Sequence, residues 1–386
     1  MKIAMIDPGA MTPFYDEALC SALAAAGAEV DLYTAPFPHL PLPAARGFRR
    51  HHAFARFLAT KPGPSGQRWA RRLRRGLAYP GDWRRLRRLL AERPPDVVHL
   101  QWSLLPWLDR GALKSLRRRG LPLVLTAHNA LPHDRPTTRR RAWARLWSSA
   151  DHLIAPSRFT AARVAAIAPQ TAPRTSVIPL GDHRPWSRPR HGQAAARERL
   201  GLSPDAPLAL FYGLLKDYKG ILPLLDAFAL CRQRLPAARL ALCGALRSSL
   251  GAIEGRLATH RLEDAIHRRF AYLSLAETQL WFEAADLVVL PYTAASQSMI
   301  PAMAYTFARP VLATAVGAFP EQVVSGETGD LVPAADSPAL GERLAELLAD
   351  RSLCHRLGAA GAAWAEQRWA WPTIAADTLA VYRKLR

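Results

Sequence analysis

Two lysines in one short loop are the residues whose types and spacing point most directly to chemistry. In FYGLLKDYKG (residues 211–220) an apolar strand ends at Gly213, a loop presents Lys216 and Lys219, and Gly220 opens a helix. Helix amino termini and ammonium groups both stabilise phosphate, so this segment predicts an anion site. The spacing matches neither GxxxxGK nor GxGxxG, and two loop lysines are also compatible with ordinary solvent-exposed charges.

A second candidate is the run of small and hydroxyl residues in PYTAASQSMIP (residues 291–301). Ser298 is positioned to cap the following helix and to leave the amides of Met299 and Ile300 free for a second phosphate. An ordinary helix cap without a ligand is the alternative. Glu321 follows Pro320 near another expected helix start, where it is either a ligand-binding group or an exposed carboxylate that favours the helix end.

The third candidate is His128, in LTAHN at the carboxyl end of an apolar strand. An open parallel sheet places its ligand contacts at that end of its strands, so we expect His128 to face a ligand cleft rather than the core. A structural hydrogen bond is the alternative role. His99 lies inside DVVHLQW and is expected to be buried with its hydrogen bonds satisfied. No GxSxG, HExxH or carboxylate-rich cluster appears, which argues against serine hydrolases and metallohydrolases.

The elements that position these residues alternate between short apolar strands and helical segments along most of the chain. This alternation predicts an α/β fold with two doubly wound, Rossmann-like parallel-sheet domains facing a cleft. We expect an amino-terminal Rossmann-like domain over 1–180, a linker over 181–207, and a carboxyl-terminal Rossmann-like domain over 208–365. Residues 366–386 are expected to form a helix that packs back on the amino-terminal domain.

The charge of the chain is concentrated in its first half. The 386 residues carry a net charge of +21, and residues 1–180 hold 29 basic against 11 acidic side chains. Residues 46–93 alone hold 15 basic and two acidic side chains, interleaved with aromatic residues in an amphipathic pattern. We expect this face either to be simply solvated or to adsorb to an anionic membrane or acceptor through Arg71, Arg74, Arg75, Arg84 and Arg88.

Other classes are disfavoured by what the sequence lacks. It contains no helix-turn-helix, zinc-finger or RNP-type pattern, so nucleic acid is not an expected partner. Its apolar runs are too short for a membrane-spanning helix, and its first residues do not resemble a signal peptide. The four cysteines form no CxxC pair, so we expect reduced thiols in a cytoplasmic protein, peripheral on the inner face of the plasma membrane.

The order of motifs resembles the retaining nucleotide-sugar glycosyltransferases of family 4, which have the GT-B fold. The resemblance runs through DVVHLQW, TAHN, HLIAPS, VIPLGDH, FYGLLKDYKG, ADLVVLPY, RPVLATAVGAFPE and SGETGDLV. It implies that Gly213, Lys216 and Lys219 bind the donor diphosphate, and that His128 lies beside the donor sugar. It also implies that the backbone at Gly9 approaches the donor phosphate and the acceptor. The same resemblance implies that the domain over 1–180 binds the acceptor and that the domain over 208–365 binds the nucleotide-sugar donor.

The chain departs from this family at one place. Two glutamates eight residues apart are usual there, and Ala295 and Met303 occupy their positions. The second glutamate normally holds the nucleotide ribose, so another group is expected to replace it, with Glu321 as the candidate. The run AASQSMIP is similar to an exopolysaccharide-type branch with a Ser-rich turn, so the loss does not imply an inactive enzyme.

The resemblance implies a hexosyltransferase that needs no metal and no cofactor. The donor is a UDP- or GDP-linked sugar, and the departing phosphate oxygen takes the proton of the acceptor hydroxyl. The expected acceptor is a glycan or a polyprenyl-diphosphate-linked sugar in bacterial polysaccharide biosynthesis. A nucleotide-sugar epimerase of the same fold and a non-catalytic polyanion-binding protein are the alternatives.

Overall fold

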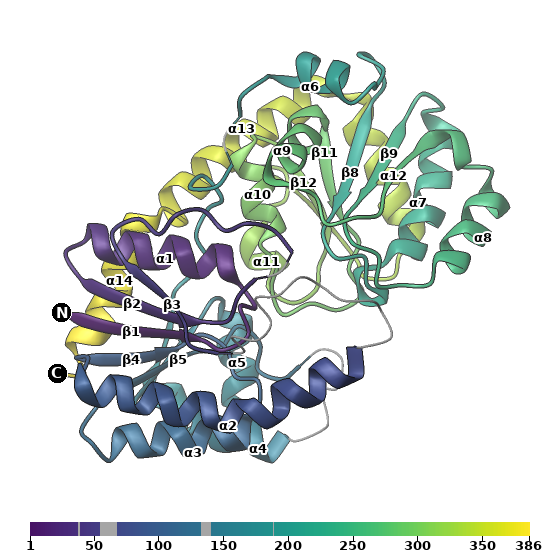
Figure 1. The fold of residues 1–386 in the computed structure, drawn as a ribbon. Coiled ribbons are helices and arrows are strands. Elements are labelled where there is room, and N and C mark those ends of the chain that lie inside the picture. Colours follow the sequence, from purple (N-terminus) through teal and green to yellow (C-terminus); the bar gives the residue numbers. More distant parts are fainter. Residues whose placement is uncertain (38, 55–67, 133–139, 188) are drawn as a thin grey trace. The chain divides into compact units, whose positions relative to one another are not determined.

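The computed structural model describes residues 1–37, 39–54, 68–132, 140–187 and 189–386, except for the side chains of 68–76. These residues form two compact units, each built around its own sheet (Figure 1). Met1–Gly181 and Trp371–Arg386 make up the first unit, and Asp182–Ala370 makes up the second. The chain therefore leaves the first unit once and later returns to it.

A seven-stranded parallel sheet forms the centre of the first unit, in the order β3-β2-β1-β4-β5-β6-β7. Its strands are β1 (Lys2–Asp7), β2 (Glu29–Thr34), β3 (Arg49–His52), β4 (Val97–Leu100), β5 (Leu123–Thr126), β6 (His152–Ala155) and β7 (Thr175–Val177). Its α-helices are α1 (Pro13–Ala25), α2 (Arg68–Glu92), α3 (Pro106–Arg117), α4 (Arg140–Trp147), α5 (Arg158–Ala165) and α14 (Trp371–Arg383). The order reverses between β1 and β4, which makes that edge the place where such a sheet binds ligands.

A six-stranded parallel sheet forms the centre of the second unit, in the order β10-β9-β8-β11-β12-β13. Its strands are β8 (Leu208–Tyr212), β9 (Arg239–Cys243), β10 (Ile266–Arg269), β11 (Leu287–Leu290), β12 (Val311–Thr314) and β13 (Gly329–Val332). Its α-helices are α6 (Gln193–Arg199), α7 (Ile221–Arg234), α8 (Leu250–His260), α9 (Leu275–Ala284), α10 (Ile300–Thr306), α11 (Phe319–Gln322), α12 (Ser337–Ala349) and α13 (Arg351–Arg368). Here the order reverses between β8 and β11.

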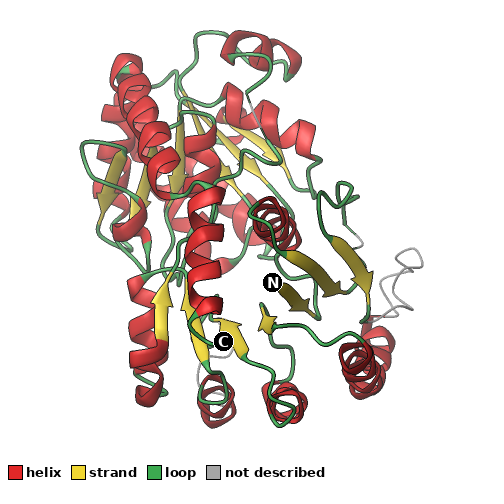
Figure 2. Ribbon diagram, turned by 90° about the vertical axis from the view of Figure 1, so that its left-hand side faces the viewer, coloured by secondary structure: helices red, strands yellow, loops and turns green. Residues whose placement is uncertain are grey.

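Burial explains why the central strands are continuous apolar runs in the sequence. Every residue of β4, β5, β11 and β12 is buried. Strands of a parallel sheet are covered on both faces, so side chains pointing either way must be apolar or hydrogen-bonded. Figure 2 shows the strands of each unit lying between helices. The prediction of two doubly wound parallel-sheet domains is confirmed.

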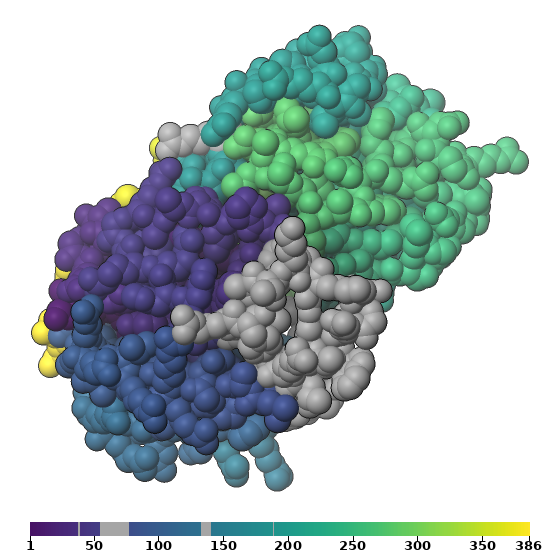
Figure 3. All heavy atoms as spheres, in the orientation of Figure 1, coloured from purple at the N-terminus to yellow at the C-terminus, as the bar shows by residue number. Residues whose placement is uncertain are grey.

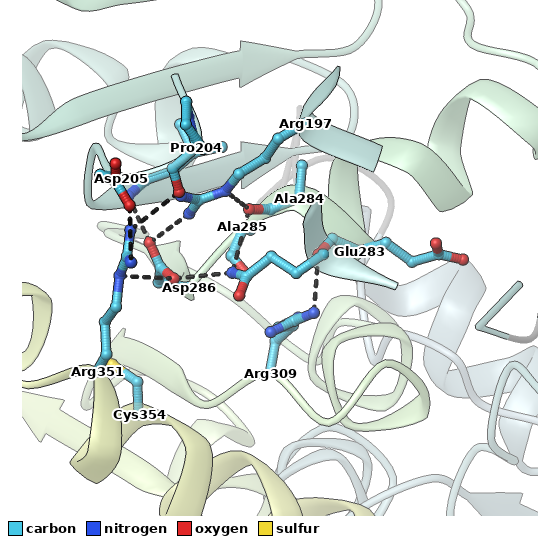
Figure 4. Close-up of polar contacts among 12 residues, drawn as sticks. Arg197, Pro204, Asp205, Glu283, Ala284, Ala285, Asp286, Arg309, Arg351 and Cys354 are labelled. Carbon is cyan, nitrogen blue, oxygen red and sulfur yellow. Dashed lines mark hydrogen bonds and ion pairs between the residues drawn. The ribbon is translucent and has the colours of Figure 1, made fainter. Parts of the chain in front are cut away.

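A buried ion pair fixes the start of the second unit, within the segment predicted as a linker (Figure 4). Nη2 of Arg197 on α6 lies 2.7 Å from Oδ2 of Asp286, and both side chains are buried. Arg197 Nε donates to the carbonyl of Ala284 at 2.9 Å, and Asp286 accepts the amide of Leu208 at 2.8 Å. Residues 182–207 therefore pack as part of the second unit and carry α6.

The returning helix α14 completes the first unit. It packs against α1, and the ring of Trp371 lies 5.6 Å from the ring of Tyr15. The hydroxyl of Tyr382 lies 2.5 Å from Nδ1 of His99 on β4, whose Nε2 lies 2.7 Å from Oγ1 of Thr126. His99 is fully buried, so its prediction as a satisfied core histidine is confirmed.

Candidate functional site

The loop that follows β8 brings an ammonium group against the backbone. Gly213 has φ of +124°, and a Cβ built on it would lie 2.9 Å from Nζ of Lys219 and 3.8 Å from Cδ1 of Ile300. Glycine therefore allows Lys219 to approach the end of β8 closely. The first residues of α10 lie at the same place, so two of the predicted segments meet here.

Lys219 is buried without a carboxylate partner. The residue is 9% exposed, and its Nζ lies 5.0 Å from the centre of the Tyr292 ring. Within the described residues no Asp or Glu forms an ion pair with it. Lys216 is half-buried, with its Nζ 5.8 Å from the centre of the Tyr218 ring. Burying a cation is unfavourable unless a counter-charge offsets it, so binding of an anion by the Lys219 ammonium stays a prediction that this geometry favours.

The loop after β11 is joined directly to the lysine loop. The amide and the hydroxyl of Thr293 both donate to the carbonyl of Tyr218, at 2.9 and 3.1 Å. A Cβ on Gly220 would lie 1.9 Å from the carbonyl oxygen of Pro291, and Gly220 has φ of +71°. Only glycine fits at this contact, so the two loops are held at a fixed separation across the point where the strand order reverses.

One detail of the predicted second phosphate site is wrong. Met299, rather than Ser298, is the N-cap of α10, and the amide of Ile300 donates to Oγ of Ser298 at 3.2 Å. The Ile300 amide is therefore not free for a ligand. The hydroxyl of a serine two residues earlier competes for this donor, because Ser side chains bond readily to nearby backbone groups.

The loop after β12 closes the same cluster. The ring of Phe319 packs 5.1 Å from the ring of Tyr292, and the amide of Ala318 donates to the carbonyl of Ser296 at 3.1 Å. Gln322 Nε2 donates to the carbonyl of Ser298 at 3.0 Å. Glu321 is half-buried on α11, one residue before Gln322. The second unit thus brings together its predicted site residues, which are Gly213, Lys216, Lys219, Ser298, Met299, Ile300 and Glu321.

In the first unit Gly9 lies in a loop that Asp7 holds in place. Oδ1 of Asp7 accepts the amide of Gly9 at 3.0 Å, and Oδ2 accepts the amide of Met11 at 2.6 Å. A Cβ on Gly9 would lie 2.8 Å from Cγ of Met11 and 3.0 Å from Cδ2 of Leu104. Asp7 ends β1 and is fully buried, so the carboxylate orders the loop at the point where this sheet reverses.

His128 lies just after β5, which is next to β4 in the sheet, and its ring is tightly packed. The ring stacks on Trp102 with centres 4.7 Å apart and planes 6° apart, and the edge of Tyr15 lies 5.3 Å away. Nε2 hydrogen-bonds to Oε1 of Gln101 at 3.1 Å, whereas Nδ1 has no partner in the described part of the chain. Burial lowers the pKa of His128 to about 3, so the ring is neutral near pH 7.

Sequence reasoning missed Gln101, Trp102 and Tyr15, although the first two lie in the motif DVVHLQW. Their signal was their position, since both follow β4 directly and therefore share an edge with His128. The sequence analysis expected His128 to face a cleft, whereas only 2% of the residue is exposed. His128 and Gly9 belong to the first unit, and the two lysines belong to the second.

The basic segment 46–93 includes β3 and the whole of α2. Arg84 and Arg88 are exposed, while Trp83, Leu86 and Leu90 are buried, as an amphipathic helix requires. The side chains of Arg71, Arg74 and Arg75 lie outside the described residues. Figure 3 shows residues 77–92, in blue, at the surface of the first unit. No helix among the described residues is long and apolar enough to cross a membrane.

Sequence models agree with the two-unit division. Residues 17–181 match the model described as Glycosyltransferase Family 4, and residues 206–350 match Glycosyl transferases group 1. A D-inositol 3-phosphate glycosyltransferase from Streptomyces scabiei is 33% identical over 309 residues, which are 74% of this chain and 67% of that relative. The chain belongs to glycosyltransferase family 4.

Solved structures of the glycosyltransferase fold agree with this family assignment. The sucrose-phosphate synthase from Thermosynechococcus elongatus superimposes with a TM-score of 0.78 at 23% identity, covering 100% of this chain and 99% of that chain. Anabaena HepE in complex with UDP-glucose gives 0.75 at 21% identity, covering 98% and 99%. These matches confirm the GT-B architecture of paired Rossmann-like domains. The family to which the chain belongs makes it a glycosyltransferase.

Proposed function

We propose that this family 4 glycosyltransferase moves a sugar from a nucleoside-diphosphate sugar to an acceptor hydroxyl with retention of configuration. The observation that carries the proposal is the buried Lys219 ammonium, which lies against Gly213 and has no carboxylate partner among the described residues. An anionic diphosphate bound at this place would offset the charge. A carboxylate-paired lysine would need no such ligand.

The proposed transfer breaks one bond to the anomeric carbon and forms another. The bond from the anomeric carbon of the sugar to the diphosphate oxygen breaks, and a bond from that carbon to the acceptor oxygen forms. The acceptor proton passes to the departing phosphate oxygen. Lys216, Lys219 and the amide of Met299 are proposed to stabilise the negative charge that grows on the diphosphate, an effect for which one donor is typically worth about 2.7–4 kcal/mol. In this account lysines and amides carry the charge, and no step is assigned to a metal or cofactor.

Retention is proposed to follow a front-face route without a covalent sugar–enzyme intermediate. In the first unit Asp7 accepts the amides of the Gly9 loop, and in the second unit Asp217 accepts the hydroxyl of Ser248. Both carboxylates are engaged in these hydrogen bonds, and neither is proposed as a nucleophile. His128 is neutral, so it can position a hydroxyl by a hydrogen bond but does not supply a positive charge.

The acceptor is proposed to carry phosphate. The relative from Streptomyces scabiei is a D-inositol 3-phosphate glycosyltransferase, and the first unit of this chain is strongly basic. A polyprenyl-diphosphate-linked glycan of a bacterial polysaccharide pathway has the same chemistry and lies at a membrane. Exposed Arg84 and Arg88 would favour peripheral attachment to the anionic inner leaflet.

The proposal is tested by incubating the protein with a panel of UDP- and GDP-sugars, with inositol phosphate or a polyprenyl-diphosphate glycan as acceptor. Transfer with an unchanged anomeric configuration, read by NMR of the product, is the expected result. Inverted product would reject retention, a new sugar isomer would identify an epimerase, and no turnover with tight polyanion binding would identify a binding protein.

A further inference from the structure

Two side-chain oxygens near the lysine loop are buried without a hydrogen-bond donor. Oε1 of Gln297 and Oε1 of Gln322 are shielded from solvent, and neither accepts a hydrogen bond from any residue that the structure describes. A buried acceptor without a donor destabilises a fold, and such atoms are few in native proteins. A pair of them in one place indicates that something else supplies the donors.

The orientation of the Gln322 amide follows from its neighbour. Its other end faces the carbonyl oxygen of Ser298 at 3.0 Å, and a carbonyl accepts only from a donor, so this end must be the NH₂ group. Oε1 of Gln322 is thereby fixed as the unused acceptor. Gln297 directly precedes Ser298, so both residues lie at the turn that leads into α10.

This cluster adjoins the candidate anion site through direct contacts. Thr293, at the start of the same loop, bonds to Tyr218 between the two lysines. Phe319, on the same short helix as Gln322, packs on Tyr292, whose ring faces Lys219. A ligand whose diphosphate lies at Lys219 would extend its attached groups along these loops. In a nucleotide sugar those groups carry hydroxyls, which are hydrogen-bond donors.

We propose that Gln297 and Gln322 accept hydrogen bonds from hydroxyl groups of the bound nucleotide sugar, on either its ribose or its transferred sugar. The inference rests on the proposed function. Ala295 and Met303 carry no carboxylate that could accept hydrogen bonds from hydroxyls of the donor. The inference assigns this recognition to two neutral carboxamides rather than to the Glu321 carboxylate. Hydroxyl recognition by these groups makes them specificity-determining residues for the donor.

The test measures binding by calorimetry for the full chain with UDP, GDP, their 2′,3′-dideoxy analogues, and UDP-glucose. If the two glutamines bind the ribose hydroxyls, wild type should bind the ribonucleotide about 5- to 50-fold more tightly than its dideoxy analogue. Gln297→Met and Gln322→Met should each reduce that ratio about 2- to 10-fold and leave the dideoxy affinity unchanged. If the sugar is read, the variants should instead reduce the preference for UDP-glucose over UDP.

Two controls separate the possible failures. Gln233→Met, at an exposed position on α7, should change neither ratio, and Gln297→Glu, which keeps an acceptor, should preserve discrimination. Gln297→Met removes an unpaired oxygen, so its unfolding temperature should equal or exceed that of wild type. Unchanged ratios in both Met variants would overturn this inference alone. Absence of binding to every nucleotide by wild type would overturn the proposed function and the inference with it.

Discussion

Lys219 approaches Gly213 so closely that a Cβ on the glycine would stand 2.9 Å from the lysine nitrogen. The absence of that Cβ is what lets a buried ammonium reach the end of β8. This relationship links the two residues in function, and each can be tested by a single substitution.

Lys219→Ala should reduce turnover of the donor at least about 100-fold, because it removes the cation that is proposed to stabilise the charge of the leaving group. The measurement is initial-rate kinetics with the sugar nucleotide that the wild type uses. Lys114→Ala, at an exposed position of the first unit, serves as the control. A near-native rate for Lys219→Ala would show that this lysine does not take part in the reaction.

Gly213→Ala should weaken donor binding although it removes no charge. The new methyl group meets Lys219 Nζ, and φ of +124° is unfavourable for alanine, so the ammonium must move. We expect the KM for the donor to rise about 10-fold or more. A far-ultraviolet circular dichroism spectrum of the variant verifies its folding. Gly251→Ala, where an added Cβ meets nothing within 4 Å, is the matched control on α8. Equal KM values for the two variants would contradict the close approach.

The buried histidines should make the first unit sensitive to acid. Burial lowers the pKa of His128 and of His99 to about 3, and the neighbouring His128 adds to the shift at His99. A native pKa below the unfolded value means that stability is fully present above about pH 6.5 and is lost as pH falls toward 3. The free energy of unfolding, measured by urea titration, should therefore fall across this window. His128→Gln should reduce the slope, and an unchanged slope would reject the assignment.

Turnover offers a separate reading of the same ring. His128 stays neutral across the neutral range. Wild type and His128→Gln should therefore show the same pH dependence of the rate near pH 6.5. A rate inflection near that pH, abolished by the substitution, would show that the ring titrates in the ordinary range during catalysis.

Arg197→Ala should destabilise the protein by about 3–5 kcal/mol, because it leaves the Asp286 carboxylate buried and unpaired. Urea denaturation followed by tryptophan fluorescence gives the change. The exposed pair of Arg234 and Glu342 provides the comparison, and Arg234→Ala should cost at most about 1 kcal/mol. Similar losses for both variants would mean that the buried pair has no special role in holding α6.

Reversing both Arg84 and Arg88 to Glu should weaken binding to anionic liposomes about 10-fold or more at moderate salt. Both residues are exposed on α2, so the folded structure should be unaffected. The same change of charge at exposed Arg268 and Arg356 of the second unit is the control. Equal binding by the two variants would assign the basic face of α2 to ordinary solvation.

Much of the architecture could be predicted because it depends on local signals. Apolar runs such as LVVL (residues 287–290) identify buried strands, and Gly213 and Gly220 mark the turns around the lysines. The position of His128 at a strand end followed from the same alternation. These features need only a few neighbouring residues to be recognised.

The remaining features depend on contacts that cross long stretches of sequence. Arg197 meets Asp286, 89 positions later, so the anchoring of residues 182–207 carries no local signal. The stacking of Trp102 on His128 depends on β4 and β5 being neighbours. The two unused glutamine oxygens are recognised only once every nearby donor has been placed.

The hydrogen bond between Tyr382 and His99 has a consequence for how the protein is made. The second unit is inserted between the two parts of the first. About 270 residues separate β4 from α14, so α14 emerges from the ribosome long after β4 has been synthesised. Until then the groove that α14 will fill stays open on the nascent chain. The inserted unit is contiguous in sequence and has no such delay, so it can fold before the domain that was begun ahead of it.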